Sequence, residues 1–178
     1  MATNPRRSLI AEPPTGYPPA IARWLWVLAD TRRRTLEVLD GLDASRIDEP
    51  GPGGNSIGTI LAHVAIIETD WLYVEILEED YPADLIALLP AEVRDGGGHL
   101  LATPGLPLAR YLEALTAVRA KLVERVGALP PEDLYRVRSL PDYDVNPEWV
   151  LNHLVQHEAE HRAEVSLIRA VFEGRRTH

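Results

Sequence analysis

Four long segments of this 178-residue chain carry apolar side chains at steps of three and four residues. This spacing places the apolar side chains on one face of an α-helix, and no segment shows the alternation that is typical of a β-strand. The chain is therefore predicted to be all-α and to fold as a four-helix bundle. The predicted helices run from Pro18–Pro19 to Gly41, from Asn55 or Ser56 to about Tyr81–Pro82, from Leu108 to Leu129, and from Pro147 to Phe172–Glu173.

The connection between the second and third predicted helices, residues 82–106, is long and rich in proline and glycine. A connection of this length lets the third helix run parallel to the second instead of returning antiparallel to it. The apolar piece Leu85–Leu89 is expected to pack down as a short helical turn. We expect residues 1–17 to form a flexible tail, residues 18–174 the bundle, and residues 175–178 a short C-terminal tail.

The charge and the absence of cysteine exclude several classes of function. The net charge is −9, from 27 acidic and 18 basic residues, which argues against a nucleic-acid partner because such a partner requires a basic surface. Without cysteine, only histidine and carboxylate side chains can bind a metal ion. No segment is apolar for long enough to span a membrane, and no signal peptide precedes the first helix, so we expect a cytoplasmic protein.

Three of the six histidines lie within the last predicted helix at four-residue steps, His153, His157 and His161. Neighbours at this spacing share one helix face, whereas the two outer histidines lie about 12 Å apart along the axis, too far to share an ion. One metal ion can therefore bind His153 with His157, or His157 with His161. We favour His157 with His161, because these two replace apolar residues on the core-facing stripe and unpaired imidazoles there would be costly to desolvate.

His63 is the best candidate for a third ligand, because it lies on the apolar face of the second predicted helix. A lone histidine in that place is more often a core residue that bonds to a carbonyl or a carboxylate. Beside an inward pair on another helix, a shared ion is the better explanation. Three neutral imidazoles favour Zn²⁺, Ni²⁺, Fe²⁺ or Mn²⁺, and they leave positions open for water or substrate.

The segments Asn55–His63 and Trp149–Arg162 resemble the DinB-like family of metal-binding four-helix bundles, and the resemblance extends over about residues 20–173. It implies an up-down-down-up bundle, a divalent metal bound by His63, His157 and His161, and a homodimer. Some members of the family are metal-dependent S-transferases or isomerases that use low-molecular-weight thiols, and many have no known activity. The resemblance therefore implies a metal-dependent enzyme, of the thiol S-transferase type, that acts on a small-molecule substrate. The family often continues with Gly-Gln after the arginine, whereas this chain continues with Ala163-Glu164.

Two acidic residues of the last helix add alternatives to this interpretation. Glu164 lies close to the same face as His161 and is a candidate fourth ligand or a hydrogen-bond acceptor for a ligand. Glu158 completes a His-Glu-x-x-His pattern, typical of zinc proteases, but the chain shows no strand for binding an extended substrate and no histidine six residues beyond His161. Glu158 is otherwise expected to flank the ion or to pair with Arg162.

Two further patterns concern the architecture more than the chemistry. Leu61–Val64 followed by Glu68 resembles Leu151–Leu154 followed by Glu158, which indicates that a helical pair was duplicated. The run Arg32–Arg34 in the first helix is expected to be a solvated face rather than a phosphate site.

Three functions remain open from the sequence, and it assigns no catalytic residue. The first is the metal-dependent enzyme, a thiol S-transferase or a hydrolase on a small molecule, in which Arg162 or an arginine of the first helix binds a substrate carboxylate. The second is a non-catalytic, metal-stabilised bundle that binds a partner. The third is a metal-free bundle in which the histidines bond to Glu68, Glu160 or Glu164.

Overall fold

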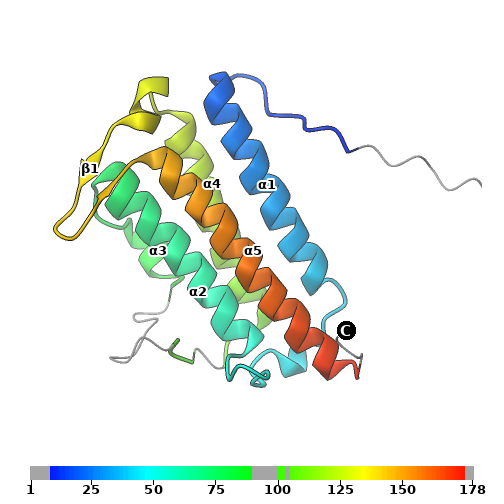
Figure 1. Ribbon diagram of the computed structural model, residues 1–178. Coiled ribbons are helices and arrows are strands. Elements are labelled where there is room, and N and C mark those ends of the chain that lie inside the picture. The colour runs from blue at the N-terminus through cyan, green and yellow to red at the C-terminus, as the bar shows by residue number, and fades with distance from the viewer. Residues whose placement is uncertain (1–8, 90–99, 103–104, 175–178) are drawn as a thin grey trace, which may run out of the picture.

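The structure, a computed structural model, describes residues 9–89, 100–102 and 105–174. Figure 1 shows four long helices that lie side by side as a bundle. Each of α1 and α2 packs against both α4 and α5. Across the described residues, no helix combines the length and the apolar character that crossing a membrane requires. The long helices are α1 (Pro19–Leu39), α2 (Ile57–Asp70, continued by a π-helix over Trp71–Leu77), α4 (Leu108–Gly127) and α5 (Pro147–Phe172).

The helix directions confirm the up-down-down-up bundle. In Figure 1, α1 and α5 run one way along the bundle while α2 and α4 run the other way. The connection from α2 to α4 therefore joins two parallel helices, as its length predicts. Within it the short helix α3 (Ala83–Ile86) buries Leu85 against the core, which confirms the expected helical turn. The rest of the connection lies partly outside the described residues.

The helix ends follow local sequence signals. The side chains of Ser56 and Asn146 accept hydrogen bonds from backbone N–H groups in the first turns of α2 and α5. A proline stands in the first turn of α1, where its missing N–H has no intrahelical partner to lose. Gly41 and Gly174, which follow α1 and α5, have φ values of 66° and 64°, a left-handed conformation that glycine adopts without strain.

The end of the second helix differs from the prediction. The helix ends at Leu77, before Tyr81, and its last turns form a π-helix. The wider turn shifts the phase of the buried face, so Tyr73 and Ile76 are buried while Val74, which an uninterrupted α-helical stripe would place inside, is exposed.

A small β-hairpin precedes α5, although the sequence shows no convincing strand. After a 3₁₀ turn at η3 (Pro131–Tyr135), β1 (Arg138–Ser139) pairs antiparallel with β2 (Asp144–Val145). Two-residue strands are too short to show alternation, so the sequence pattern could not indicate them. A second 3₁₀ turn, η1 (Ala44–Arg46), follows α1.

Two arginines and two glutamates, one from each long helix, form a buried cluster in the bundle, which we call the Arg–Glu quartet. Arg32 Nε and Nη2 donate to Glu158 at 2.7 Å and to Glu68 at 2.6 Å. Arg119 donates to Glu68 at 2.5 Å and to Glu158 at 2.8 Å. Both glutamates are only 2% exposed. Each carboxylate thus binds both guanidinium groups, and the four charges sum to zero.

This cluster corrects the expectation that Arg32–Arg34 forms a solvated face. Arg33 and Arg34 are exposed, as predicted, and both pair with Asp30 on their own helix. Arg32 is 7% exposed and lies on the core-facing side of α1. Its counter-charges come from α2 and α5, so the local sequence of α1 could not identify them.

The quartet also shows an internal two-fold relation, in which α1 corresponds to α4 and α2 to α5. Arg32 Nη1 donates to the carbonyl of Leu115, one turn before Arg119. Arg119 Nη1 donates to the carbonyl of Leu28, one turn before Arg32. These reciprocal contacts are what a duplicated helical pair predicts.

The same relation extends along α2 and α5. The capping residues Ser56 and Asn146 are separated by the same number of residues as the acids Glu68 and Glu158. His63 is related to His153 in the same way, so the weak sequence repeat coincides with matched positions in the structure.

We predict that removing one quartet acid strongly destabilises the fold. Glu158→Ala leaves buried arginine charge without its partner and should lower the free energy of unfolding by about 3–5 kcal/mol. Urea titration followed by circular dichroism measures this. The matched control is Glu37→Ala, which removes the surface partner of Arg33 and should change stability little. Equal effects of the two substitutions would contradict the role of the quartet.

The quartet also predicts how stability depends on pH. Burial alone would raise the pKa of Glu68, but the charges of Arg119 and Arg32 outweigh it and hold this pKa below the ordinary 4.5. The pKa of Glu68 is lower in the folded state than in the unfolded chain. The contribution of Glu68 to the free energy of unfolding is therefore complete above about pH 4.5 and is lost as the pH falls through the folded-state pKa. Unfolding free energies from about pH 7 to about pH 3 should fall less steeply for Glu68→Gln than for the wild type; parallel curves would refute this.

Candidate metal centre

Three histidines from α2 and α5 lie close together where these two helices pack. His63 lies in the middle of α2 and is 1% exposed, while His157 and His161 lie one turn apart on α5 and are partly buried. The centroid of the His63 ring is 4.9 Å from that of each of the other two rings. The structure thus unites the three residues that the sequence predicted, on the two helices expected to carry them. His99 and His178 lie outside the described residues.

The spacing of the His63 and His157 ring nitrogens fits a shared metal ion, and a nitrogen of His161 completes the group. Nε2 of His157 lies 3.0 Å from Nε2 of His63, and one nitrogen from each of the three rings lies within 4.8 Å of the others. Two nitrogens bonded at about 2.1 Å to one ion would lie about 3.0–3.4 Å apart at the usual angles. Among the described residues these three form the group that could hold a metal, and imidazole donors suit a divalent transition metal.

Glu164 lies beside the centre as a hydrogen-bond partner of one histidine. Its Oε2 lies 3.2 Å from Nδ1 of His161, and its Oε1 accepts a hydrogen bond from Nδ2 of Asn55 at 2.9 Å. A proton on Nδ1 of His161 donates to this carboxylate, which leaves Nε2 to bind an ion. The geometry therefore favours the acceptor alternative over a fourth ligand. The sequence indicated Asn55 only as a helix cap, because its contact to α5 depends on the packing of α2 against α5.

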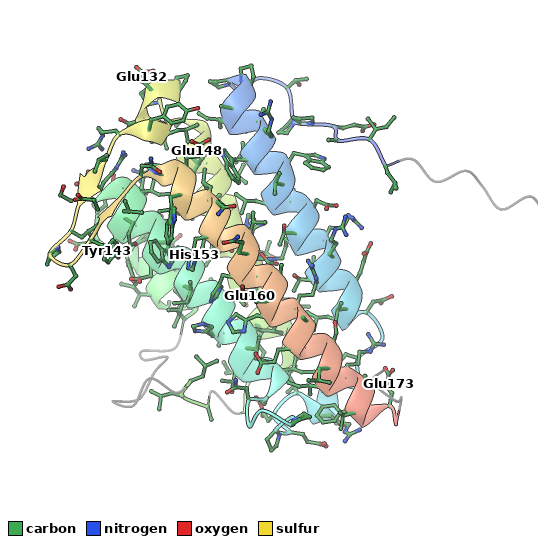
Figure 2. The ribbon with its side chains drawn as sticks, viewed as in Figure 1. Glu132, Tyr143, Glu148, His153, Glu160 and Glu173 are labelled. Carbon is green, nitrogen blue, oxygen red and sulfur yellow. The ribbon has the colours of Figure 1, made fainter. Side chains whose placement is uncertain are left out.

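His153 lies outside the histidine group. Its ring stacks on Trp149 at 5.1 Å and 8° and also contacts Trp71 at 4.8 Å (Figure 2 labels His153 on α5). Burial lowers the pKa of His153. The ring nevertheless lies only 5.8 Å from that of His157, so it separates the tryptophans from the metal centre.

Glu158 has neither of the roles expected from the sequence. It does not pair with Arg162 or flank the histidines; both of its oxygens accept hydrogen bonds from the quartet arginines. Glu68 is engaged in the same way and does not bond to a histidine. Of the three acids that the metal-free alternative named, Glu164 is the one in contact with a histidine, His161. The Glu of the His-Glu-x-x-His pattern is consequently not positioned as the general base of a protease.

A small hollow lies at the start of α2, and none of the three histidines is in its lining. It measures about 240 Å³ and its lining includes Asn55, Ser56 and Thr59. Thr59 lies one turn before His63, and Asn55 bonds the carboxylate that contacts His161. The hollow provides space for a small molecule near the histidine group.

Helix order, helix directions and the three imidazoles together define a class, the four-helix bundles with a histidine metal centre. The family model of the DinB superfamily matches residues 27–165, most of the chain, and the protein therefore belongs to the DinB superfamily. A search of curated proteins gave no match.

Among solved structures, the fold is similar to that of YfiT from Bacillus subtilis. The two chains are 16% identical, the similarity covers 93% of this chain and 94% of that one, and the TM-score is 0.60. YfiT is described as a probable metal-dependent hydrolase with an unusual four-helix bundle topology. At this identity the similarity shows that the two proteins share a fold.

We predict that metal uptake separates the histidines into two groups. Protein purified without a nickel column should contain about one equivalent of a divalent transition metal, and His63→Ala or His157→Ala should abolish uptake. His153→Ala should largely retain it, because its ring lies outside the group. Elemental analysis and the thermal shift on adding Zn²⁺ or Ni²⁺ measure this. Less than about a tenth of an equivalent in the wild type, with no thermal shift, would refute the metal centre.

Proposed function

We propose that this protein is a divalent-metal-dependent enzyme that acts on a small molecule. The single observation that carries the proposal is the convergence of His63, His157 and His161 from two helices. Three protein ligands are the number found in catalytic zinc sites, whereas structural sites usually have four. A divalent ion bound there would lower the pKa of a water or thiol and so supply a nucleophile at neutral pH.

The chain's own residues support this role in distinct ways. The carboxylate of Glu164 fixes the ring orientation of His161, and Asn55 in turn holds Glu164. The burial of His63 keeps water from surrounding its imidazole. His157 and His161 are only partly buried, so the centre is not sealed from solvent, which favours an enzyme over a bundle whose metal is fully enclosed.

Two reactions are consistent with this centre, and they differ in the nucleophile. Hydrolysis would use water, and the description of YfiT as a probable metal-dependent hydrolase supports it. Transfer to a low-molecular-weight thiol is supported by membership of the DinB superfamily, because some proteins of this family are S-transferases. Either reaction needs a small electrophilic substrate, and we propose that the enzyme works as a homodimer.

The alternative is a non-catalytic bundle in which the metal only stabilises the fold and the surface binds a partner. The polar pairing of His161 with Glu164 is compatible with this role too. The two functions differ in one observable: a structural metal leaves no exchangeable coordination position, and an added thiol or anion should not perturb the spectrum of a Co²⁺-substituted protein.

The proposed function is tested with metal-reconstituted protein and two sets of probes. One set contains chromogenic esters, amides and phosphates; the other contains a chromogenic electrophile with and without added thiol. Turnover in one set should fall at least about 100-fold in His157→Ala, since the ion is lost with its ligand. Exposed Glu160 on α5 provides the control, and Glu160→Gln should behave as the wild type. Turnover equal in metal-free and metal-loaded protein would contradict the proposal.

Glu164 gives a further prediction. Glu164→Gln removes the carboxylate charge beside His161 while keeping its size, and should weaken metal affinity about 10–100-fold. Competition with a chromophoric chelator measures the affinity. Unchanged affinity in Glu164→Gln, with normal folding by circular dichroism, would show that this contact does not support the ligand.

A further inference from the structure

A second and larger cavity lies at the other end of the α2–α5 face, where the β-hairpin leads into α5. It measures about 550 Å³. We call it the aromatic cavity, and its lining is formed by Trp71, Val137, Tyr143, Asp144, Val145, Asn146 and Trp149. None of these residues belongs to the histidine group, so the cavity is separate from the metal centre.

The internal two-fold relation explains where this cavity lies. Asn146 and Trp149 in its lining correspond to Ser56 and Thr59 in the small hollow at the start of α2. The relation also matches ring contacts: His153 packs on Trp71 at 4.8 Å as His63 packs on His161 at 4.9 Å. The two-fold arrangement therefore places the two hollows at matched helix starts, and only the aromatic cavity has tryptophans in its lining.

Three aromatic rings surround the cavity and remain partly open to solvent. Trp71 lies 5.4 Å from Trp149 and 6.2 Å from Tyr143, measured between ring centroids. Trp149 is 49% exposed and Tyr143 is 44% exposed, although both are large apolar side chains. Ring faces of this kind attract cations through the aromatic quadrupole, most strongly for tryptophan.

The charge around the cavity is negative. Asp144 is the charged residue among the described residues of its lining. The hydroxyl of Tyr143 donates to the buried carboxyl of Glu75 at 2.7 Å. Burial, this hydrogen bond and the charges of Glu75, Asp70 and Asp142 raise the pKa of Tyr143 to about 12.

The two arginines that flank Val137 do not offset this charge, and Arg136 pairs with Glu78 and Asp133. Arg138 in β1 is 2% exposed, and its guanidinium donates to Asp133 and to three backbone carbonyls instead of facing the cavity. An anionic ligand would therefore meet Asp144 without a compensating base. A positively charged ligand would meet both the acid and the ring faces.

From this combination we propose that the aromatic cavity binds an organic cation, a protonated amine or a quaternary ammonium on an apolar body. The apolar body packs among the valines and aromatic rings, while the cationic group lies over a tryptophan face near Asp144. The volume of the cavity is within the range of small-molecule sites.

The cavity also lies close to the metal centre. His153 is the wall between them, because its ring contacts Trp149 and Trp71 on one side and His157, at 5.8 Å, on the other. The proposal extends to a ligand whose cationic end occupies the cavity and whose other end passes this one ring toward the histidine group. This last step rests on the proposed function and identifies the substrate class as small molecules that carry an amine.

The four tryptophans provide a direct test of binding. Two of them, Trp71 and Trp149, line the cavity, and the other two, Trp24 and Trp26, lie on α1. Benzyltrimethylammonium should shift the indole N–H signals of the cavity pair in a ¹H–¹⁵N spectrum and leave the α1 pair unchanged. Benzyl alcohol and benzoate, of similar shape without the positive charge, should bind at least about ten-fold more weakly.

Variants separate this proposal from its alternatives. Trp149→Ala should weaken benzyltrimethylammonium binding roughly ten-fold. Asp144→Asn should weaken it about three-fold, whereas the neighbouring control Glu148→Gln should not. Equal affinity for the cation and benzyl alcohol would overturn the proposal. A second pair of results would also overturn the proposal: the wild type does not bind the cation, and its dimer dissociates in Trp149→Ala. These results would show that a second copy of the chain covers the cavity.

Metal-free His157→Ala distinguishes this proposal from the proposed function. The cavity does not contain His157, so this variant should bind the cation with wild-type affinity. Cation binding without any turnover by the metal-loaded wild type would refute the enzyme and leave the cavity assignment intact. Turnover by the metal-loaded wild type without cation binding would refute the cavity assignment and leave the proposed enzyme intact.

Discussion

The buried Arg–Glu quartet fixes how the four long helices sit along one another. Each helix contributes one charge, and a charge shifted by one turn would lose partners that a low-dielectric core cannot replace with water. The metal centre depends on this register, because Glu158 is the immediate neighbour of His157 and Glu68 follows His63 on α2. The contacts that align the two glutamates therefore also align the imidazoles.

The four long helices are related by a two-fold arrangement around the quartet, but the metal centre occurs in only one of the two halves. Both halves carry a histidine at matched positions, His63 and His153, and both pack it against a ring of the facing helix. In one half that ring is His161, which offers a nitrogen donor. In the other half it is Trp71, which offers none. One half can thus take an ion, and the other presents aromatic faces.

This division gives the α2–α5 face two chemistries that adjoin through His153. The histidine half has nitrogen donors and a carboxylate that orients one of them, which suits the activation of a nucleophile. The aromatic half has open ring faces and acidic surroundings, which suit the recognition of a cationic, apolar group. The proposed substrate binding in one half and the proposed chemistry in the other would both use residues that α2 and α5 hold in place.

The sequence by itself determined the four long helices, the N-caps of α2 and α5 and the shared face of His157 and His161, because each depends on residues close together in the chain or on a helical period. His63 was predicted as their partner, but its approach depends on the packing of α2 against α5. His157 and His161 share a face wherever α5 packs, and Ser56 caps α2 through its own first turn. Only the tertiary structure decided the roles of Arg32 and Glu158 and the openness of the aromatic cavity. Those features depend on charges and surfaces that different helices bring together, and no local pattern in the chain encodes which partner a buried charge meets.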